Sequence, residues 1–415
     1  MKNYLKFFLL LLTSVFLTGI HAQSLKKGCT DPKAKNFDQT AVINDGNCLY
    51  PLTLFTPPLK AYLPEEVNET SGLAFVKGSL WTMNDSGGKP VLYRIDTATG
   101  KVLQRITIKN ATNRDWEDLA YDDQFLYIGD FGNNSGNRKD LKIYKVRLKD
   151  IPDQKDDSVK ASLIEFSYED RGNKKIPSRK KNNFDCEAFT VIGDSLYLFS
   201  KNWENQKTRI YVLPKKPGQY VAERVDSMDV HGLITAADYD PKTNELILLG
   251  YRNKTWIPFM WLFSHLDNAD FRHANKRRIM MPRIITTQTE GISYAKNKSV
   301  FISSEATKIG KQSLYSFNTN KWTGTGKEQG ETLIEQVAVK SNKKLLVTLK
   351  STIKKPFKIQ VYDHYGDEVK VRQSKLKNKK GKPVLAIKTE PLKKGKYFVK
   401  LTIHSNKSVK AFMVK

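Results

Sequence analysis

Short apolar runs alternate with polar turns from about residue 52 to residue 326 of this 415-residue chain. One unit contains Glu117-Asp118-Leu119-Ala120-Tyr121, then Leu126-Tyr127-Ile128, a Gly/Asn-rich turn and Ile143-Tyr144-Lys145-Val146. Alternation of apolar and polar positions, with Gly and Asn between the runs, predicts short β-strands. The same order recurs in four more units, whose first runs begin near Ser71, Glu187, Ala237 and Glu290.

This repeat predicts an all-β protein with a β-propeller over residues 52–326, in which five blades are recognisable and six are the alternative. A single small sheet cannot bury both of its faces, whereas radial stacking buries each blade against the next. Fourth strands fit residues 101–108, 161–168 and 219–226. The last unit has no clear fourth strand, and we expect residues 52–56 to supply it and close the ring.

The composition changes after about residue 327. Residues 331–415 carry 22 Lys and Arg against 6 Asp and Glu, so they contribute +16 to the net charge of +27. Alternating runs at 357–362 and 397–403 predict a small Lys-rich β-sandwich over residues 327–415. An arginine-rich stretch interleaved with aromatic residues is missing, so we interpret the lysines as a solvated surface and expect no specific nucleic-acid partner.

The first 22 residues have the pattern of a signal peptide. Lys2 and Lys6 precede an apolar run over residues 7–17, and a small-residue cleavage site ends at Ala22. No other segment is long and apolar enough to predict a transmembrane span. We therefore expect a protein that is secreted or held at the outer cell surface.

Residues 23–51 form a short module bounded by cysteines and rich in Asp and Asn. In an exported chain the close pair Cys29 and Cys48 is expected to form a disulfide. Cys186 lies in a strand-like run and is expected to be a buried, small apolar residue. The Asp and Asn side chains of the module fit either turn formation or calcium ligation, and the sequence leaves both open.

Both flanking segments resemble known modules. Gly28-Cys29-Thr30-Asp31-Pro32 and Asp45-Gly46-Asn47-Cys48 resemble a short Cys-bounded module of secreted Bacteroidota proteins. The last 80 or so residues resemble the C-terminal sorting domain of type IX secretion cargo, through Val361-Tyr362-Asp363, Gly395-Lys396-Tyr397 and the terminal Lys415. This second resemblance implies export by the type IX secretion machinery as a partner. The usual Pro-Asn-Pro near the start of that domain is missing.

Candidate chemistry lies where the first strand of each unit begins. Aligning the units places Ser71, Glu117, Glu187, Ala237 and Glu290 in one column, and Asp115 and Asp185 two residues before their glutamates. Residues two apart on a strand face the same side, so these acids are expected to look into the mouth of the central channel. Asp115, Glu117, Asp185, Glu187 and Glu290 are therefore the predicted ligand-binding residues.

Clustered carboxylates repel one another and need a cation, raised pKa values or basic partners. Calcium fits oxygen-only ligands, which makes Glu117, Glu187 and Glu290 the candidate metal ligands. Lys201 and Arg252 could instead pair with them. Alternatively, the acids bond backbone amides of a neighbouring blade and only fix its packing. His231, Trp116, Trp203 and Trp256 lie at strand ends, where exposed or packing roles compete with a place at the channel mouth.

The repeat also resembles, more distantly, secreted propellers of the phytase-like and SdiA-regulated groups, through Asp115-Trp116-Glu117-Asp118-Leu119-Ala120 and Thr289-Glu290-Gly291-Ile292. That resemblance implies calcium binding and hydrolysis of a phosphoester or ester. Two hypotheses follow. In the first, the propeller binds a ligand or partner at its channel mouth; in the second, it is a calcium-dependent hydrolase of the phytase, esterase or lactonase kind. The sequence has no Gly-x-Ser-x-Gly elbow and no His-Glu-x-x-His motif.

Overall fold

The structure is a computed structural model that describes residues 26–172, 179–284, 288–308, 310–324, 333–351, 353, 356–363, 368–379, 382–403 and 406–415. The predicted signal peptide, residues 1–22, lies outside these ranges. The helices described are single turns: η1 (Glu65–Val67), η2 (Leu148–Asp150), η3 (Asp267–Ala269), η4 (Lys296–Lys298) and α1 (Asn320–Thr323). Among the described residues, no helix has the length and apolarity that crossing a membrane requires. The other regular elements of the described residues are β-strands.

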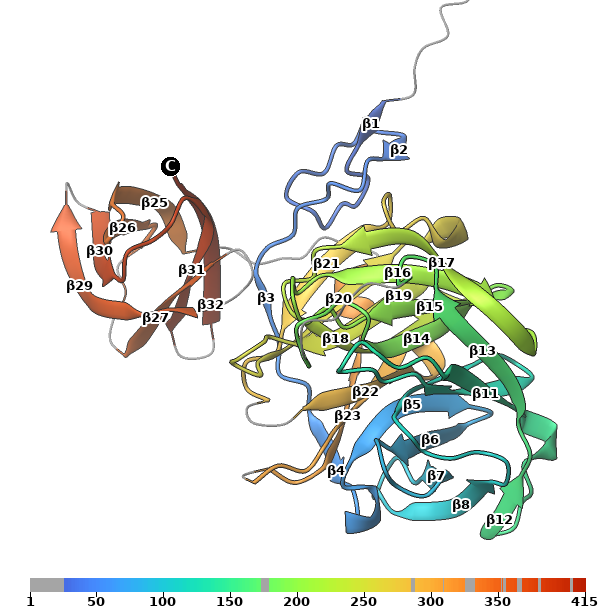
Figure 1. Cartoon of the computed structure of the whole chain (residues 1–415). Helices are drawn as coiled ribbons and strands as arrows, with labels where there is room; N and C mark the ends of the chain where they lie inside the picture. The colour runs from blue at the N-terminus through green and yellow to red at the C-terminus, as the bar shows by residue number, and fades with distance from the viewer. Residues whose placement is uncertain are drawn as a thin grey trace, which may run out of the picture.

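Five blades of four antiparallel strands each form a closed propeller (Figure 1). The inner strands β5, β9, β14, β18 and β22 each contact the next, and β22 contacts β5. The predicted propeller with five blades is confirmed. In order, the blades are β5 (Thr70–Val76), β6 (Ser79–Asn84), β7 (Val91–Ile95) and β8 (Val102–Ile108); β9 (Trp116–Tyr121), β10 (Phe125–Asp130), β11 (Leu141–Arg147) and β13 (Ser162–Tyr168); β14 (Cys186–Ile192), β15 (Ser195–Ser200), β16 (Thr208–Pro214) and β17 (Gly218–Met228); β18 (Leu233–Asp240), β19 (Glu245–Tyr251), β20 (Pro258–Ser264) and β21 (Asn275–Met280); and β22 (Thr289–Tyr294), β23 (Ser299–Ser304), β24 (Ser313–Asn318) and β4.

Ring closure uses a different segment from the predicted one. Strand β4 (Leu59–Tyr62) pairs antiparallel with β24 and is the outer strand of the fifth blade. The expected closing segment, residues 52–56, instead provides β3 (Thr53–Leu54), which pairs parallel with β21 as a fifth strand of the fourth blade. The N-terminal chain thus ties two blades together. The N-terminal chain does close the ring, as predicted, but residues 59–62 supply the closing strand and not residues 52–56.

Outer edges of other blades are also covered. Strand β13 of the second blade pairs parallel with β17 of the third, so these two blades share one continuous sheet of eight strands. Strand β12 (Asp156–Val159) pairs parallel with β8 of the first blade. Covered edges leave fewer unpaired backbone groups for unwanted strand addition.

The core consists of apolar layers between successive blades. Phe131 of the second blade meets Phe189 of the third edge to face, with ring centroids 5.2 Å apart. Cys186 is free and fully buried in the same layer, as predicted. Trp116 is fully buried between the first and second blades, and its indole nitrogen donates to the Thr112 carbonyl at 3.1 Å. Trp116 is therefore a packing residue.

Inner strands carry a β-bulge near their first residues. In β9, β14, β18 and β22 one residue is left out of the pairing with the second strand of the blade. The bulged residues are Glu117, Glu187, Thr235 and Glu290. The sequence alignment had placed Ala237 in this column, and the bulge corrects it to Thr235. A bulge turns the extra side chain out of the regular alternation, which gives three glutamates the same position in three blades.

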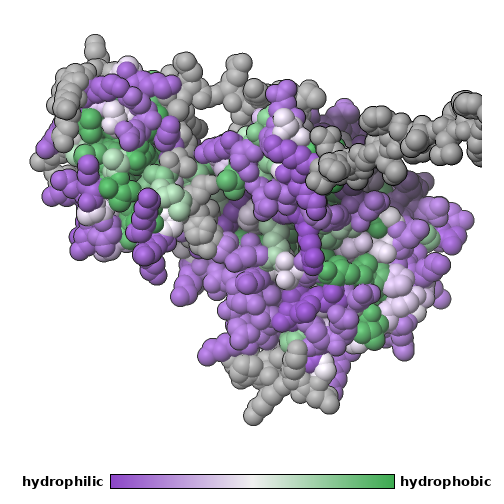
Figure 2. Space-filling model, turned by 90° about the horizontal axis from the view of Figure 1, so that it is seen from above, coloured by the Kyte–Doolittle hydropathy of each residue, from purple (hydrophilic) through white to green (hydrophobic). Residues whose placement is uncertain are grey.

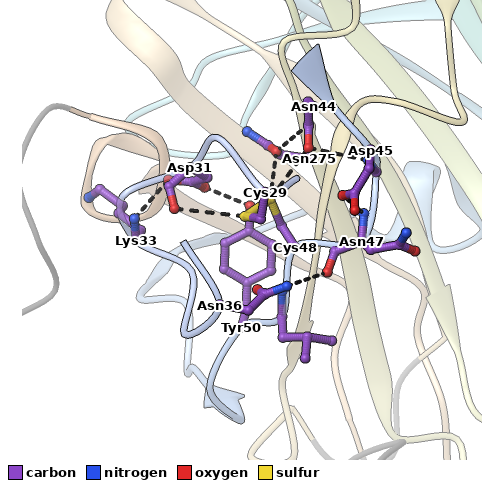
Figure 3. The surroundings of a disulfide bond; sticks show 12 residues. Cys29, Asp31, Lys33, Asn36, Asn44, Asp45, Asn47, Cys48, Tyr50 and Asn275 are labelled. Carbon is purple, nitrogen blue, oxygen red and sulfur yellow. Dashed lines mark hydrogen bonds between the residues drawn. A yellow bond between two sulfur atoms is a disulfide. The ribbon is translucent and has the colours of Figure 1, made fainter. Parts of the chain in front are cut away.

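The cysteine-bounded module rests on the fourth blade (Figure 3). Its short strands β1 (Lys27–Gly28) and β2 (Ile43–Asn44) pair parallel, and the predicted disulfide joins Cys29 and Cys48. Asn44 Nδ2 donates to the His273 carbonyl at 2.6 Å. The Asp31 and Asp45 carboxylates accept hydrogen bonds from amides two residues later. These bonds are the ones expected if Asp31 and Asp45 form turns.

The C-terminal strands form two four-stranded antiparallel sheets, drawn in orange and red in Figure 1. One contains β25 (Ile334–Ser341), β26 (Lys344–Leu349), β30 (Lys382–Thr389) and β29 (Val371–Lys379), and the other contains β28 (Glu368–Val369), β27 (Phe357–Asp363), β31 (Gly395–Ile403) and β32 (Asn406–Val414). Apolar side chains from both sheets share one core, as expected of a β-sandwich. Figure 2 shows a face of the whole molecule on which hydrophilic residues predominate and apolar residues gather in a few patches.

Candidate functional site

Seven carboxylates of the described residues meet at one mouth of the channel. Antiparallel strands bring the start of each inner strand and the end of the second strand to the same end of a blade. Inner-strand starts supply Asp115, Glu117, Asp185, Glu187 and Glu290, which are all five predicted residues. Second-strand ends add Asp85 and Glu305, which the sequence analysis missed.

These carboxylates form three overlapping groups in which ligand oxygens lie within 4.8 Å of one another. The first group is Asp85, Asp115 and Glu117; the second is Glu117, Asp185 and Glu187; the third is Asp85, Glu290 and Glu305. The three predicted metal ligands therefore divide between groups: Glu117 and Glu187 share the second, and Glu290 belongs to the third. Three carboxylates at such distances can ligate one calcium ion, which takes six to eight oxygens.

Hydrogen bonds already occupy much of the second and third groups. The Asp185 carboxylate accepts from the Asn133 amide and the Trp203 indole, both at 2.7 Å. Glu187 pairs with the Lys201 ammonium. Glu305 accepts from the Gln288 side-chain amide at 2.7 Å. Their oxygens are therefore less available to a metal ion than their positions suggest.

Asp115 and Glu117 differ from these acids. Among the described residues, no group donates a hydrogen bond to either side-chain carboxylate, although Glu117 is only 3% exposed. Gly132 makes room for them: a Cβ atom on this glycine would lie 1.9 Å from Glu117 Oε1 and 2.5 Å from the Asp115 carboxyl carbon. A buried acid without a partner is costly, so the first group has unused capacity for a cation.

The crowding raises the pKa values of the cluster. Burial, with the neighbouring charges of Asp85 and Asp185, raises the pKa of Asp115 to about 7. Burial likewise raises the pKa of Asp85 to about 6 and that of Glu305 to about 7. The pKa of Glu117 is also raised, by burial and by Glu187. At neutral pH the cluster must hold protons or bind a cation.

Lys201 is the cation held inside the mouth. It follows β15, its side chain is 4% exposed, and its ammonium pairs with Glu187. That ammonium also lies 4.9 Å from the Trp203 ring centroid and 5.2 Å from the Tyr251 ring centroid. Lys201 was a predicted partner of the acids, and the structure places it so. Arg252, the other predicted partner, donates to the His231 carbonyl.

Two further acids fix the blades, as the alternative interpretation supposed, but they are different residues. Asp118, next to Glu117, is fully buried and accepts from the amides of Phe189 at 3.1 Å and Ala237 at 3.2 Å. Asp238 accepts from the Tyr294 amide of the fifth blade at 2.7 Å. Asp118 and Asp238 are therefore the acids that bind backbone amides of other blades and fix the packing. Among the five predicted ligand-binding acids, Asp185 does the same through the Asn133 amide.

The remaining candidates lie outside the cluster or at its margin. His231 Nδ1 lies 3.3 Å from Asp229 Oδ1. Trp256 is 39% exposed and stacks on Tyr251, with ring centroids 4.8 Å apart. Trp203 borders the cluster through its bond to Asp185. Asp85 and Glu305 could have been found because each directly follows a second strand, as Lys201 does.

Residues 341–415 match the family described as the secretion system C-terminal sorting domain. A type IX sorting domain of this kind directs secretion and attachment at the cell surface, so the chain is a secreted or surface-attached β-propeller protein. The match covers the tail alone. No curated protein matches the chain in sequence.

Solved structures resemble the chain only remotely. An endo-arabinase from Bacteroides thetaiotaomicron is 11% identical over 64% of this chain and 96% of its own, with a TM-score of 0.38. A GH43_1 enzyme from Xanthomonas citri is 12% identical over 64% and 93%, also at 0.38. Hydrazine synthase from Kuenenia stuttgartiensis is 11% identical over 70% of this chain and 65% of its own, at 0.31. The five closed blades described above define the fold independently of these similarities.

Proposed function

We propose that this secreted propeller binds an oxygen-rich ligand at its acidic channel mouth, through a calcium ion held by Asp85, Asp115 and Glu117. The observation that carries the proposal is the pair of carboxylates, Asp115 and Glu117, that accept no hydrogen bond from the described residues and lie within 4.8 Å of each other and of Asp85. Oxygen ligands alone favour calcium over zinc.

The arrangement also leaves a route for the ligand. Asp85 and Asp115 are partly exposed, whereas Glu117 is nearly buried. An ion at this group would have protein oxygens below it and open coordination positions toward solvent. Since calcium takes six to eight oxygens and three carboxylates supply at most six, hydroxyl, carboxylate or phosphate oxygens of a ligand can complete the shell.

Thermal unfolding with and without calcium tests this proposal. Calcium should raise the Tm of the wild-type protein, because an ion that binds only the folded state stabilises it. The Asp115→Asn/Glu117→Gln variant should fold and lose the shift. Asp194→Asn, at a fully exposed acid remote from the mouth, should keep it. A wild-type Tm that is the same in calcium and in chelator would refute the site.

A calcium-dependent hydrolase is the second candidate, and one observation favours it. Asp115 is a partly exposed carboxyl with a pKa of about 7, and it stands beside Glu117. A group with that pKa can accept and return a proton near neutral pH. Hydrolysis of p-nitrophenyl phosphate or p-nitrophenyl acetate that requires calcium and is lost in Asp115→Asn would support catalysis. Ligand binding without turnover would leave the binding function alone.

A further inference from the structure

We infer that Lys201 is a built-in counter-ion that limits the channel mouth to a single calcium ion, because its ammonium takes the place of a second cation beside Glu187 and Glu290. This inference rests on the proposed calcium site and adds that the channel mouth binds one calcium ion and not two. It also separates the cluster into a half that the protein neutralises itself and a half that an external ion must neutralise.

The position of Lys201 in the repeat is unusual. The residue after the second strand donates its amide to the carbonyl of the residue that directly precedes the inner strand: Asp85 to Glu69 at 3.0 Å, Lys201 to Asp185 at 2.9 Å, and Glu305 to Gln288 at 2.9 Å. These three residues are therefore structurally equivalent. Two of them are acids that face the mouth, and the third is a lysine. One blade thus presents a positive charge where two others present a negative one.

The lysine is held firmly in that place. Its ammonium pairs with Glu187, while Trp203 and Tyr251 flank it with their rings. Attraction between an ammonium and an aromatic face is strengthened when both are shielded from water. Glu187 and Lys201 are each only a few per cent exposed. A buried ion pair of this kind is not readily exchanged for a solvent ion, because separating it leaves both charges unpaired.

The influence of this charge is uneven across the mouth. Lys201 offsets the negative charge at Glu187, Asp185 and Glu290, and also that at Asp85, which the first and third groups share. Asp115 instead has Arg138 in its vicinity, and the guanidinium of Arg138 is already paired with the Asp130 carboxylate at 2.5 Å. Glu117 lies between the halves and belongs to both the first and the second group. Without Lys201, the group of Glu117, Asp185 and Glu187 would need a cation of its own.

Isothermal titration calorimetry with calcium chloride tests the inference on the full-length mature chain. The wild type should bind one calcium ion. Lys201→Met, which keeps the length of the side chain and removes its charge, should bind two. Lys180→Met is the matched control, because Lys180 is an exposed lysine whose ammonium lies 4.4 Å from the Trp203 ring centroid. This control should bind one ion.

The outcomes separate the two proposals. A wild type that binds no calcium refutes the proposed site, and the stoichiometry rule with it. A wild type and a folded Lys201→Met that both bind one ion refute the role of Lys201 and leave the calcium site standing. If Lys201→Met does not fold, Lys201→Gln answers the same question, since its neutral amide can still donate to Glu187. Adding Glu187→Gln to either variant should return the stoichiometry from two to one.

Discussion

The Asp118 carboxylate accepts a hydrogen bond from the Ala237 amide at 3.2 Å, although the two residues belong to inner strands that are not neighbours in the ring. The same oxygen accepts from the Phe189 amide of the intervening blade at 3.1 Å. One side chain thus joins three blades at the channel axis.

Replacing Asp118 should therefore destabilise the whole propeller. Asp118→Ala leaves the amides of Leu119, Phe189 and Ala237 buried without acceptors, at about 1 kcal/mol or more each, so we expect a loss of about 3 kcal/mol or more in the free energy of unfolding. Asp118→Asn keeps one acceptor oxygen and should lose about 1 kcal/mol. Chemical denaturation measures both. Equal losses in the two variants would contradict the bridging role.

Gly132 should prove necessary for calcium binding and dispensable for folding. The atoms that its new Cβ would strike belong to the carboxylates of Glu117 and Asp115, and these side chains can move aside. Gly132→Ala should therefore displace the two free carboxylates and weaken calcium binding by about tenfold or more, equivalent to about 1.4 kcal/mol. Calorimetry measures the change, and circular dichroism checks the fold.

Gly88→Ala is the matched control for this variant. A Cβ atom on Gly88 would lie 3.7 Å from its nearest neighbour, Asn113 Nδ2, which is an ordinary contact distance. Gly88 is also near the mouth in sequence, three residues after Asp85. The Gly88→Ala variant should bind calcium with the affinity of the wild type. Equal affinities for both alanine variants would show that Gly132 does not position the carboxylates.

The blade pattern was visible in the sequence because each strand alternates apolar and polar residues and most runs contain an aromatic. The closing strand β4 was not visible in the sequence. It reads Leu59-Lys60-Ala61-Tyr62 and exposes both Leu59 and Tyr62, so its apolar positions do not mark a buried face. Bulges were also invisible, because a bulge adds one residue to a strand without changing its composition. Hence Ala237 was aligned with the glutamates although Thr235 occupies that position.

The candidate site was predictable only where it depends on inner strands. Asp115, Glu117, Asp185, Glu187 and Glu290 all begin such strands, and the structure brings them together. Asp85 and Glu305 come from second-strand ends, and only the antiparallel pairing shows that these ends lie at the same mouth. Hydrogen bonding then decides which acids remain free. That distinction requires distances between blades, which no single-blade pattern contains.

The Cys29–Cys48 disulfide should stabilise the N-terminal module and leave the propeller unaffected. The two cysteines are 19 residues apart, so the disulfide is worth about 3 kcal/mol by the loss of loop entropy in the unfolded chain. The Cys29→Ser/Cys48→Ser variant should be cleaved by trypsin after Lys33 and Lys35 faster than the wild type, as read by mass spectrometry. The main unfolding transition should not move. Protease resistance equal to the wild type would show that contacts with the fourth blade hold the module by themselves.

Stability in chelator should fall as the pH rises, and calcium should weaken this dependence. Asp115 and Glu305 have folded pKa values of about 7, against ordinary values of 3.8 and 4.5. Between about pH 4 and pH 7 these groups keep protons in the folded protein that the unfolded chain releases. The folded state binds more protons there, so the free energy of unfolding falls as pH rises, and the penalty is complete above the folded pKa.

In chelator, we expect each of these two groups to cost the wild type about 2 kcal/mol between pH 5 and pH 8. Calcium should restore the part that Asp115 loses at pH 8, because Glu305 is not a proposed ligand, and should restore little at pH 5, where protons compete for the same oxygens. The Asp115→Asn/Glu117→Gln variant should show a flatter profile and no response to calcium. A wild-type stability in chelator that rises from pH 5 to pH 8 would mean that the carboxylates of the mouth are already neutralised within the protein, and that no cation is needed there.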